Sequence, residues 1–199
     1  MSNLVVDLVA GADGRHRCAW GASDPLYLPY HDDEWGRPLR DERALFELLT
    51  LEAFQSGLSW LTILRKRPGF RAAFDGFDVD QVAAYGDDDR ARLLADTAIV
   101  RNVAKVDATI ANARATVALH DQGRSLVDLV FSHTPPPEER PAGRYHALSE
   151  LPAATPSSAA LAKELKRSGF RFVGPTVAYA FMQAAGVVDD HLEGCWVKA

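Results

Sequence analysis

Two cysteines and two histidines are the residues of this sequence best suited to bind a metal. Cys18 and Cys195 are the only cysteines of the 199-residue chain and lie near its opposite ends. They allow a disulfide, two inert thiols or two metal ligands, and a cytoplasmic location disfavours the disulfide. His191 lies four residues before Cys195, so on one helical turn both would face the same way. With His31, the two cysteines and two histidines complete a tetrahedral set for zinc.

The expected metal is structural rather than catalytic. The pair His191 and Cys195 alone is more often a neutral core histidine beside a thiol than a metal site. If Cys18 and His31 complete the set, zinc has no open coordination position and does not readily activate water. Its ligands would join the N-terminal segment to the C-terminal end, and the binding free energy would become folding free energy. We therefore expect one structural Zn²⁺ per chain.

The distribution of charge permits a local basic face. A formal net charge of −5 argues against a nucleic-acid coat that binds by bulk charge, but lysine and arginine cluster within residues 65–67 and 163–171. Such clusters are most often solvated helix ends. No apolar stretch approaches the roughly 20 residues that span a bilayer, and the run 4–10 lacks the features of a secretory signal. We expect a cytoplasmic protein without a membrane segment.

Helical periodicity dominates the chain. Leu45, Leu48, Leu49 and Phe54 recur at helical spacing, and Asp41 is well placed as an N-cap. No segment alternates with period two between turn signals, so no strand is predicted. The expected fold is all-α, with helices over 41–57, 59–66, 78–85, 87–96, 102–120, 125–133, 157–168 and 175–186.

Two of these helices are joined by a short hairpin. Four prolines in residues 134–144 predict an exposed loop before them. Ser157 or Ser158 can cap the first helix, and Gly169 can close it in the left-handed conformation. Pro175 suits the first position of the second helix, because its missing N–H costs nothing there. A helix, a tight hairpin and a second helix are therefore expected over about 157–186.

Several motifs occur in order along nearly the whole chain and together resemble the DNA-3-methyladenine glycosylase I family. They are Cys18-Ala19-Trp20, then Tyr27, Tyr30, His31 and Trp35, the run from Leu51 to Trp60, the run from Lys166 to Gly174, the run from Ala180 to Ala184, Asp190-His191 and Gly194-Cys195.

This resemblance implies an enzyme of the helix-hairpin-helix DNA glycosylase superfamily with a structural zinc. Such an enzyme hydrolyses the N-glycosylic bond of 3-methyladenine in double-stranded alkylated DNA, releases the free base and leaves an abasic site. Residues 18–199 would form a single glycosylase domain, acting as a monomer. Residues 1–17 would be an N-terminal extension, and the sequence leaves open whether it is ordered or disordered.

The resemblance also assigns roles in a base pocket. A glycosylase must rotate its target nucleotide out of the duplex and hold it. Glu52 would be the catalytic residue that reads the hydrogen-bonding edge of the base, while Tyr30 and Trp60 stack around it, and Tyr27 and Trp20 shape the wall. Methylation at N3 makes adenine cationic, so aromatic rings and a carboxylate would favour it over neutral adenine. Without the motif, Glu52 would be an ordinary solvated carboxylate and the aromatic rings ordinary core residues.

The hairpin is the expected contact with the DNA backbone. Its amides between Gly169 and Gly174 could bind a phosphate, and Arg171, Lys166 and Arg167 would add positive charge. Such contacts read position rather than sequence.

Two further residues bear on the chemistry. Thr176 or a neighbour stands where bifunctional relatives carry a nucleophilic lysine, so we expect no lyase activity. Asp189 matches the position of a superfamily aspartate that would stabilise the sugar cation or position water, although this family often has asparagine there. Asp189 could instead cap a turn, which is the favoured interpretation.

Three other functions are considered. A helical DNA-binding module could keep the zinc and hairpin without chemistry, but Glu52, Tyr30 and Trp60 argue against it. The same framework could act on another alkylated purine, which sequence discriminates poorly. A zinc hydrolase is least favoured, because all four metal positions would be occupied by protein ligands.

Overall fold

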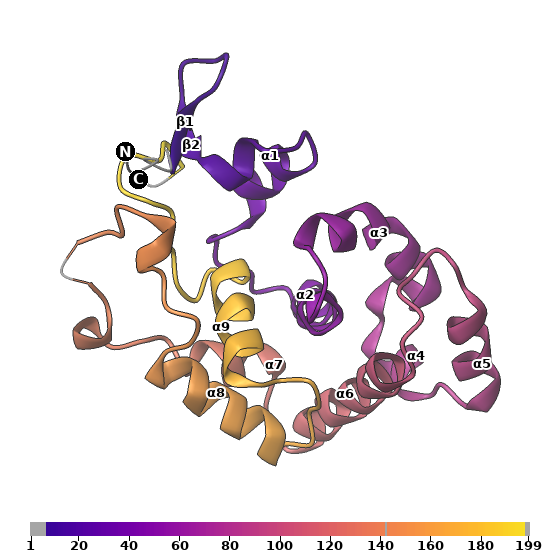
Figure 1. Cartoon of the computed structure of the whole chain (residues 1–199). Coiled ribbons are helices and arrows are strands. Elements are labelled where there is room, and N and C mark those ends of the chain that lie inside the picture. Colours follow the sequence, from indigo (N-terminus) through magenta and orange to yellow (C-terminus); the bar gives the residue numbers. More distant parts are fainter. Residues whose placement is uncertain (1–6, 142, 198–199) are drawn as a thin grey trace.

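The computed structural model describes residues 7–141 and 143–197. Figure 1 shows helices grouped around α2, with the two strands and both described chain ends close together on one side. The strands are β1 (Leu8–Ala10) and β2 (His16–Cys18), and the helices are α1 (Tyr27–Pro29), α2 (Glu42–Gln55), α3 (Trp60–Ala73), α4 (Val79–Ala83), α5 (Asp87–Ala95), α6 (Val103–Asp121), α7 (Leu126–Phe131), α8 (Pro156–Arg167) and α9 (Pro175–Ala184). Single helical turns add Ala19–Ala22, Tyr30–Glu34, Asp75–Phe77, Pro137–Glu139 and Leu148–Glu150.

The central helix is α2, which contacts α3, α6, α7 and α9. Asp41 caps it as predicted, because its side chain accepts from the amide of Ala44 at 2.8 Å. Every residue from Leu45 to Phe54 is buried, including two glutamates. A helix buried on all sides is a core element, so its few polar side chains are held at fixed positions inside the protein.

Helix α3 is longer than the sequence predicted. The expected end at residue 66 is wrong, because the helix continues through Pro68 to Ala73. Proline removes one helical hydrogen bond, but Phe70 and Ala73 beyond it are buried against the core. Tertiary burial therefore overrides the local stop signal.

The expectation of a chain without strands is also wrong. β1 and β2 pair antiparallel, with Leu8 opposite Cys18. Gly14 turns the chain between them at a φ of 76°, a conformation that favours glycine. Three-residue strands are too short to show alternation, which explains why the pattern missed them. Of the N-terminal extension 1–17, residues 7–17 form this ordered hairpin, and residues 1–6 lie outside the described part.

The predicted pair of helices joined by a hairpin is present as α8 and α9, which pack on each other (Figure 1). The cap of α8 is Thr155, not Ser157 or Ser158, because Thr155 and Ser158 exchange hydrogen bonds in a capping box. Gly169 closes the helix at a φ of 94°, as expected. No helix in the described ranges is long and apolar enough to cross a membrane.

Candidate active site and metal-binding cluster

A cavity of about 260 Å³ opens between the end of α2, the start of α3, α9 and the segment 20–35. All five residues predicted for catalysis and substrate binding line it, although they come from three separate parts of the sequence. The lining residues are Trp20, Tyr27, Tyr30, Trp35, Glu52, Gln55, Trp60, Ala180 and Gln183.

Aromatic rings form most of the wall. Trp20 and Tyr27 meet edge to face, with ring centroids 5.6 Å apart and planes at 88°. Tyr30 and Trp60 lie 5.3 Å apart at 48°. Burial raises the pKa of Tyr30 well above its ordinary value, so this phenol stays neutral. The rings present a rigid apolar surface whose π faces attract positive charge.

Tyr27 also fixes the mouth of the cavity. Its hydroxyl oxygen accepts a hydrogen bond from the amide of Leu61 in the first turn of α3, at 3.0 Å. Ser59 caps the same helix by accepting from the amide of Thr62. These contacts hold the start of α3 against the segment that carries Tyr27 and Tyr30, so the two walls keep their spacing.

Among the described residues that line the cavity, Glu52 is the one acidic side chain, and it is 4% exposed. No described residue donates a hydrogen bond to its carboxyl group. Burial raises the pKa of Glu52 to about 8. In the empty cavity the group is therefore mainly protonated at neutral pH, and a cation placed beside it would favour the carboxylate.

Sequence reasoning missed four lining residues as site residues: Trp35, Gln55, Ala180 and Gln183. Gln55 follows Glu52 by three residues and so shares its face of α2, a spacing that could have found it. Trp35, Ala180 and Gln183 belong to motifs that carried the resemblance, but nothing in their spacing places them at the cavity.

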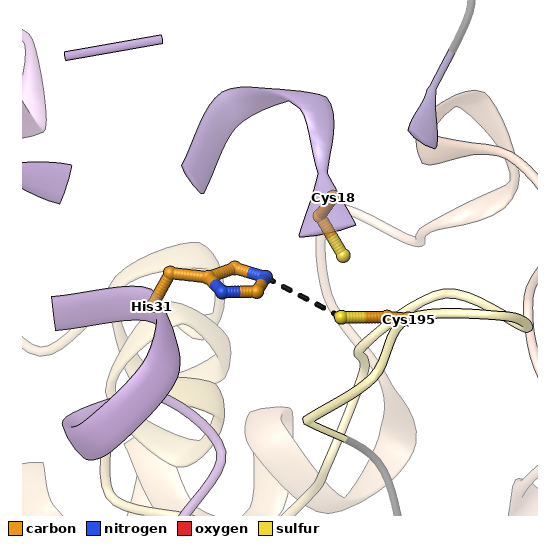
Figure 2. Close-up of side chains that lie close together, drawn as sticks. All are labelled: Cys18, His31 and Cys195. Carbon is orange, nitrogen blue, oxygen red and sulfur yellow. Dashed lines mark hydrogen bonds between the residues drawn. The ribbon is translucent and has the colours of Figure 1, made fainter. Parts of the chain in front are cut away.

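The second group of polar residues joins the two ends of the chain. Figure 2 shows the thiols of Cys18 and Cys195 and the ring of His31 pointing toward one another. Their ligand atoms all lie within 4.8 Å, and His31 Nε2 is 3.6 Å from Cys195 Sγ. Both cysteines are free thiols, so they are not joined in a disulfide. Ligand atoms around a tetrahedral zinc lie about 3.3–3.8 Å apart. The distance between His31 Nε2 and Cys195 Sγ falls within this range.

The two histidines of the predicted zinc site are oriented alike. His31 Nδ1 lies 2.8 Å from a carboxylate oxygen of Asp32, and His191 Nδ1 lies 2.6 Å from one of Asp189. At His31 the carboxylate favours the tautomer with the proton on Nδ1, which leaves Nε2 as the lone-pair donor. His191 itself is outside the three-residue cluster. Its Nε2 faces the backbone oxygen of His31 at 3.3 Å, and the two rings are 4.8 Å apart.

The contact between the two thiols shifts their pKa values in opposite directions. The hydrogen bond from Cys18 is the main cause that lowers the pKa of Cys195, and the same contact raises the pKa of Cys18. Backbone structure holds both in place, because Cys18 ends β2 and the amide of Trp196 donates to His16 in the same strand. The cluster is thus assembled by the hairpin that the sequence did not predict.

The hairpin between α8 and α9 is anchored to α6. Asn112 accepts from the amide of Arg171 at 2.7 Å and donates to its carbonyl oxygen at 3.2 Å. The amide of Gly169 donates to Lys166, so it is already used at the end of α8. Among the described residues, nothing accepts from the amides of 172–174. Four of the five residues predicted to contact DNA are exposed around this turn: Lys166, Arg167, Gly169 and Arg171, with Gly174 half-buried.

Comparison with known proteins decides the family. The model of a family described as methyladenine glycosylase matches residues 20–198. The chain belongs to this family. It is 47% identical over 182 residues to DNA-3-methyladenine glycosylase 1 of Escherichia coli (strain K12), covering 90% of this chain and 95% of the relative. It is 40% identical over 185 residues to DNA-3-methyladenine glycosylase of Haemophilus influenzae, covering 92% and 97%.

Solved structures of methyladenine glycosylases have the same fold. A crystal structure of 3-methyladenine DNA glycosylase I is 48% identical, with a TM-score of 0.84 over 90% of this chain and 98% of that one. A structure of the Staphylococcus aureus enzyme, described for its recognition of 3-methyladenine, is 36% identical with the same TM-score, covering 92% and 96%. The resemblance found in the sequence is therefore confirmed.

In this methyladenine glycosylase, Asp189 lies outside the aromatic cavity. It lines a second cavity of about 480 Å³ between α9 and the loop before α8. Its carboxylate accepts from the amide and faces the ring of His191. These contacts favour the interpretation of Asp189 as a turn cap and histidine partner over a direct role beside the base.

Proposed function

We propose that this chain hydrolyses the N-glycosylic bond of 3-methyladenine in alkylated DNA, as a base-excision repair glycosylase that leaves an abasic site. One observation carries the proposal: a cavity walled by aromatic rings holds a single buried carboxyl group without a hydrogen-bond partner among the described residues. The names of the family and of the relatives agree with it.

The cavity suits a flipped cationic purine. Tyr30 and Trp60 would stack around the ring, while Trp20 and Tyr27 close the sides. The positive charge of an N3-methylated adenine would pair with Glu52 and lower its raised pKa, so the carboxylate forms as the lesion enters. Neutral adenine offers no such charge, so the same cavity would bind it less tightly.

The bond to be broken is that between sugar C1′ and base N9. Its electron pair moves into the methylated ring and cancels the positive charge, so 3-methyladenine leaves as a neutral molecule. Water adds to C1′ and loses a proton, which completes the hydrolysis. Because the charged base is already a good leaving group, binding and orientation supply much of the catalysis and a strong general acid is unnecessary.

The same geometry supports hydrolysis without lyase activity. No lysine is among the nine residues that line the cavity. Lys105, which is buried, donates to the carbonyl oxygens of Phe54 and Ser56 at 2.8 and 2.6 Å. Thr176 is exposed at the start of α9. Among the described residues, none supplies an amine at the cavity for a Schiff base with the sugar.

DNA would be held at the hairpin and at the mouth of the cavity. The amides of 172–174 are available for a phosphate, and Lys166, Arg167 and Arg171 supply charge nearby. Leu58 is 41% exposed in the turn between α2 and α3, beside cavity residues Gln55 and Trp60. An exposed leucine there can fill the gap that a flipped base leaves in the stack. The monomeric state and the cytoplasmic location stay predictions.

Base release from methylated DNA tests this function. The wild-type protein should release 3-methyladenine, detected by chromatography, and Glu52→Gln should slow its single-turnover release by about 100-fold. Glu138→Gln, at an exposed glutamate, is the matched control and should keep the wild-type rate. If the wild-type protein binds DNA but releases no base, a non-enzymatic DNA-binding module becomes the better interpretation.

We also propose that Cys18, His31, Cys195 and His191 hold one structural zinc ion. Two thiols and two imidazoles whose Nδ1 atoms face carboxylates form a donor set typical of such a site. When bound, the ion would tie β2 to the C-terminal segment. The purified protein should contain about one zinc per chain by elemental analysis, and Cys195→Ser should lose it and unfold at a clearly lower temperature. A metal-free wild-type protein with unchanged thermal stability would contradict this proposal.

A further inference from the structure

A second polar side chain reaches the aromatic cavity from a different helix than Glu52. Gln183 lies on α9 and lines the cavity beside Ala180 of the same helix. Its amide carries both a donor and an acceptor, so its effect on a bound base depends on which atom faces the cavity.

A buried acid fixes this orientation. Asp190 is 7% exposed, and its Oδ2 atom accepts from Gln183 Nε2 at 2.8 Å and from the Tyr179 hydroxyl at 2.6 Å. A carboxylate only accepts hydrogen bonds, so the NH₂ end of Gln183 must face Asp190. The carbonyl oxygen, Oε1, is therefore the atom turned away from Asp190.

This oxygen is available to a ligand. Within the described residues no group donates to Gln183 Oε1, and the only buried side-chain polar atoms without a partner are Thr50 Oγ1 and Trp60 Nε1. Gln183 Oε1 is consequently accessible rather than buried and unpaired. Because Gln183 lines the cavity, the accessible oxygen supplies a fixed acceptor there.

We propose that Gln183 Oε1 accepts a hydrogen bond from the exocyclic amino group of the base and thereby makes the cavity selective for 3-methyladenine over 3-methylguanine. This inference rests on the proposed glycosylase function. Adenine carries an amino donor at the ring position where guanine carries a carbonyl acceptor. An acceptor facing another acceptor leaves both unpaired, so the guanine lesion is disfavoured.

In this arrangement Asp190 and Tyr179 are positioning residues, which act through Gln183. The amino group has two hydrogens, so it can donate to Gln183 while Glu52 reads another part of the same edge. 3-Methylguanine also carries an amino group at C2, so a comparison with 3-methylhypoxanthine, which lacks that group, isolates the effect of position 6.

The test measures the ratio of the two bases released from one methylated DNA sample. Gln183→Met keeps the length of the side chain and removes the acceptor. The ratio of single-turnover rates for 3-methyladenine and 3-methylguanine should fall by about tenfold. Gln81→Met, at an exposed glutamine of α4, should leave it unchanged. Zinc content should stay the same in both variants, and Gln183→Met should unfold at a somewhat lower temperature because buried Asp190 loses one hydrogen bond while that from Tyr179 remains.

Competition by free bases provides a second measurement that does not need catalysis. 3-Methylhypoxanthine carries a carbonyl oxygen in place of the amino group. The wild-type protein should bind 3-methyladenine about tenfold more tightly than this analogue, and Gln183→Met should remove most of the difference. An active wild-type protein whose ratios do not change in Gln183→Met overturns this inference alone. A wild-type protein that releases neither base overturns the proposed function as well.

Discussion

The two buried glutamates of α2 lie five residues apart and have opposite surroundings. Glu47 is 6% exposed and forms ion pairs with Arg67 and Arg71, with closest distances of 2.5 and 2.9 Å. Glu52 is 4% exposed and has no cationic partner among the described residues. One carboxylate is paired with two guanidinium groups, and the other is kept mainly neutral by burial.

This difference separates a structural acid from a functional one. Around Glu47 the charges compensate one another, so no ligand is needed there. Around Glu52 the protein leaves a polar group that a cationic ligand would satisfy, and the folded state bears that cost before the ligand arrives. Substitutions at the two positions should therefore have opposite effects on stability.

Removing the charge of Glu47 should destabilise the protein. Glu47→Gln removes one of the two carboxylate partners of Arg67, which keeps its ion pair with Glu34, and should lower the free energy of unfolding by about 3 kcal/mol at pH 7. Denaturant unfolding measures it. Glu138→Gln serves as the exposed control and should differ from wild type by less than about 0.5 kcal/mol. A stability equal to wild type would show that the ion pairs with Arg67 and Arg71 contribute little.

Removing the charge of Glu52 should stabilise the protein, in a manner that depends on pH. The pKa of Glu52 is raised to about 8 in the folded state from an ordinary value of 4.5. The folded protein thus retains a proton that the unfolded chain has lost, and stability falls as pH rises from 4.5 to 8. Glu52→Gln should match wild type near pH 4.5 and be more stable by about 4 kcal/mol at pH 8.

Measuring the free energy of unfolding of both proteins across this pH range tests whether the pKa of Glu52 is raised. A constant difference between Glu52→Gln and wild type from pH 4.5 to 8 would mean that the pKa of Glu52 is not raised. Glu47→Gln should show no stabilisation at any pH in the same range, which sharpens the contrast between the two positions.

A smaller effect is expected at the residue that holds the end of α2. Lys105 on α6 donates to the carbonyl oxygens of Phe54 and Ser56, so it fixes the turn after Glu52 without touching the Glu52 carboxyl group. Lys105→Met should cost about 1–2 kcal/mol and slow base release severalfold. Lys163→Met, at an exposed lysine of α8, is the control. Unchanged rates in Lys105→Met would show that this turn positions nothing in the cavity.

Local signals predicted most of the helices and how several of them begin and end. The Asp41 cap, the closing Gly169 and Pro175 at the start of α9 depend on neighbouring residues, so the sequence carries them. The resemblance brought Glu52 together with Tyr30 and Trp60, which the structure places in one cavity.

The features that the sequence did not predict depend on contacts between distant segments. Pro68 lies inside α3 because burial beyond it outweighs a lost hydrogen bond, and β1 exists because it pairs with β2 beside the C-terminal segment. The hydrogen bond of Gln183 to Asp190 and the isolation of Glu52 are likewise tertiary. No local pattern reports whether a buried acid has a partner, and this is what distinguishes Glu52 from Glu47.

Helix α6 fixes the distance between the end of α2 and the hairpin that joins α8 to α9. Lys105 donates a hydrogen bond to the carbonyl oxygen of Phe54 at the end of α2, and Asn112 accepts one from the amide of Arg171 in the hairpin. The two side chains are seven residues apart, almost two helical turns, so they project from nearly the same face with a rise of about 10.5 Å between them. In the proposed complex, helix α6 therefore fixes the distance between the hairpin that binds a phosphate and the cavity that receives the base. At every site on DNA, the protein would therefore place the target nucleotide at the same distance from the bound phosphate.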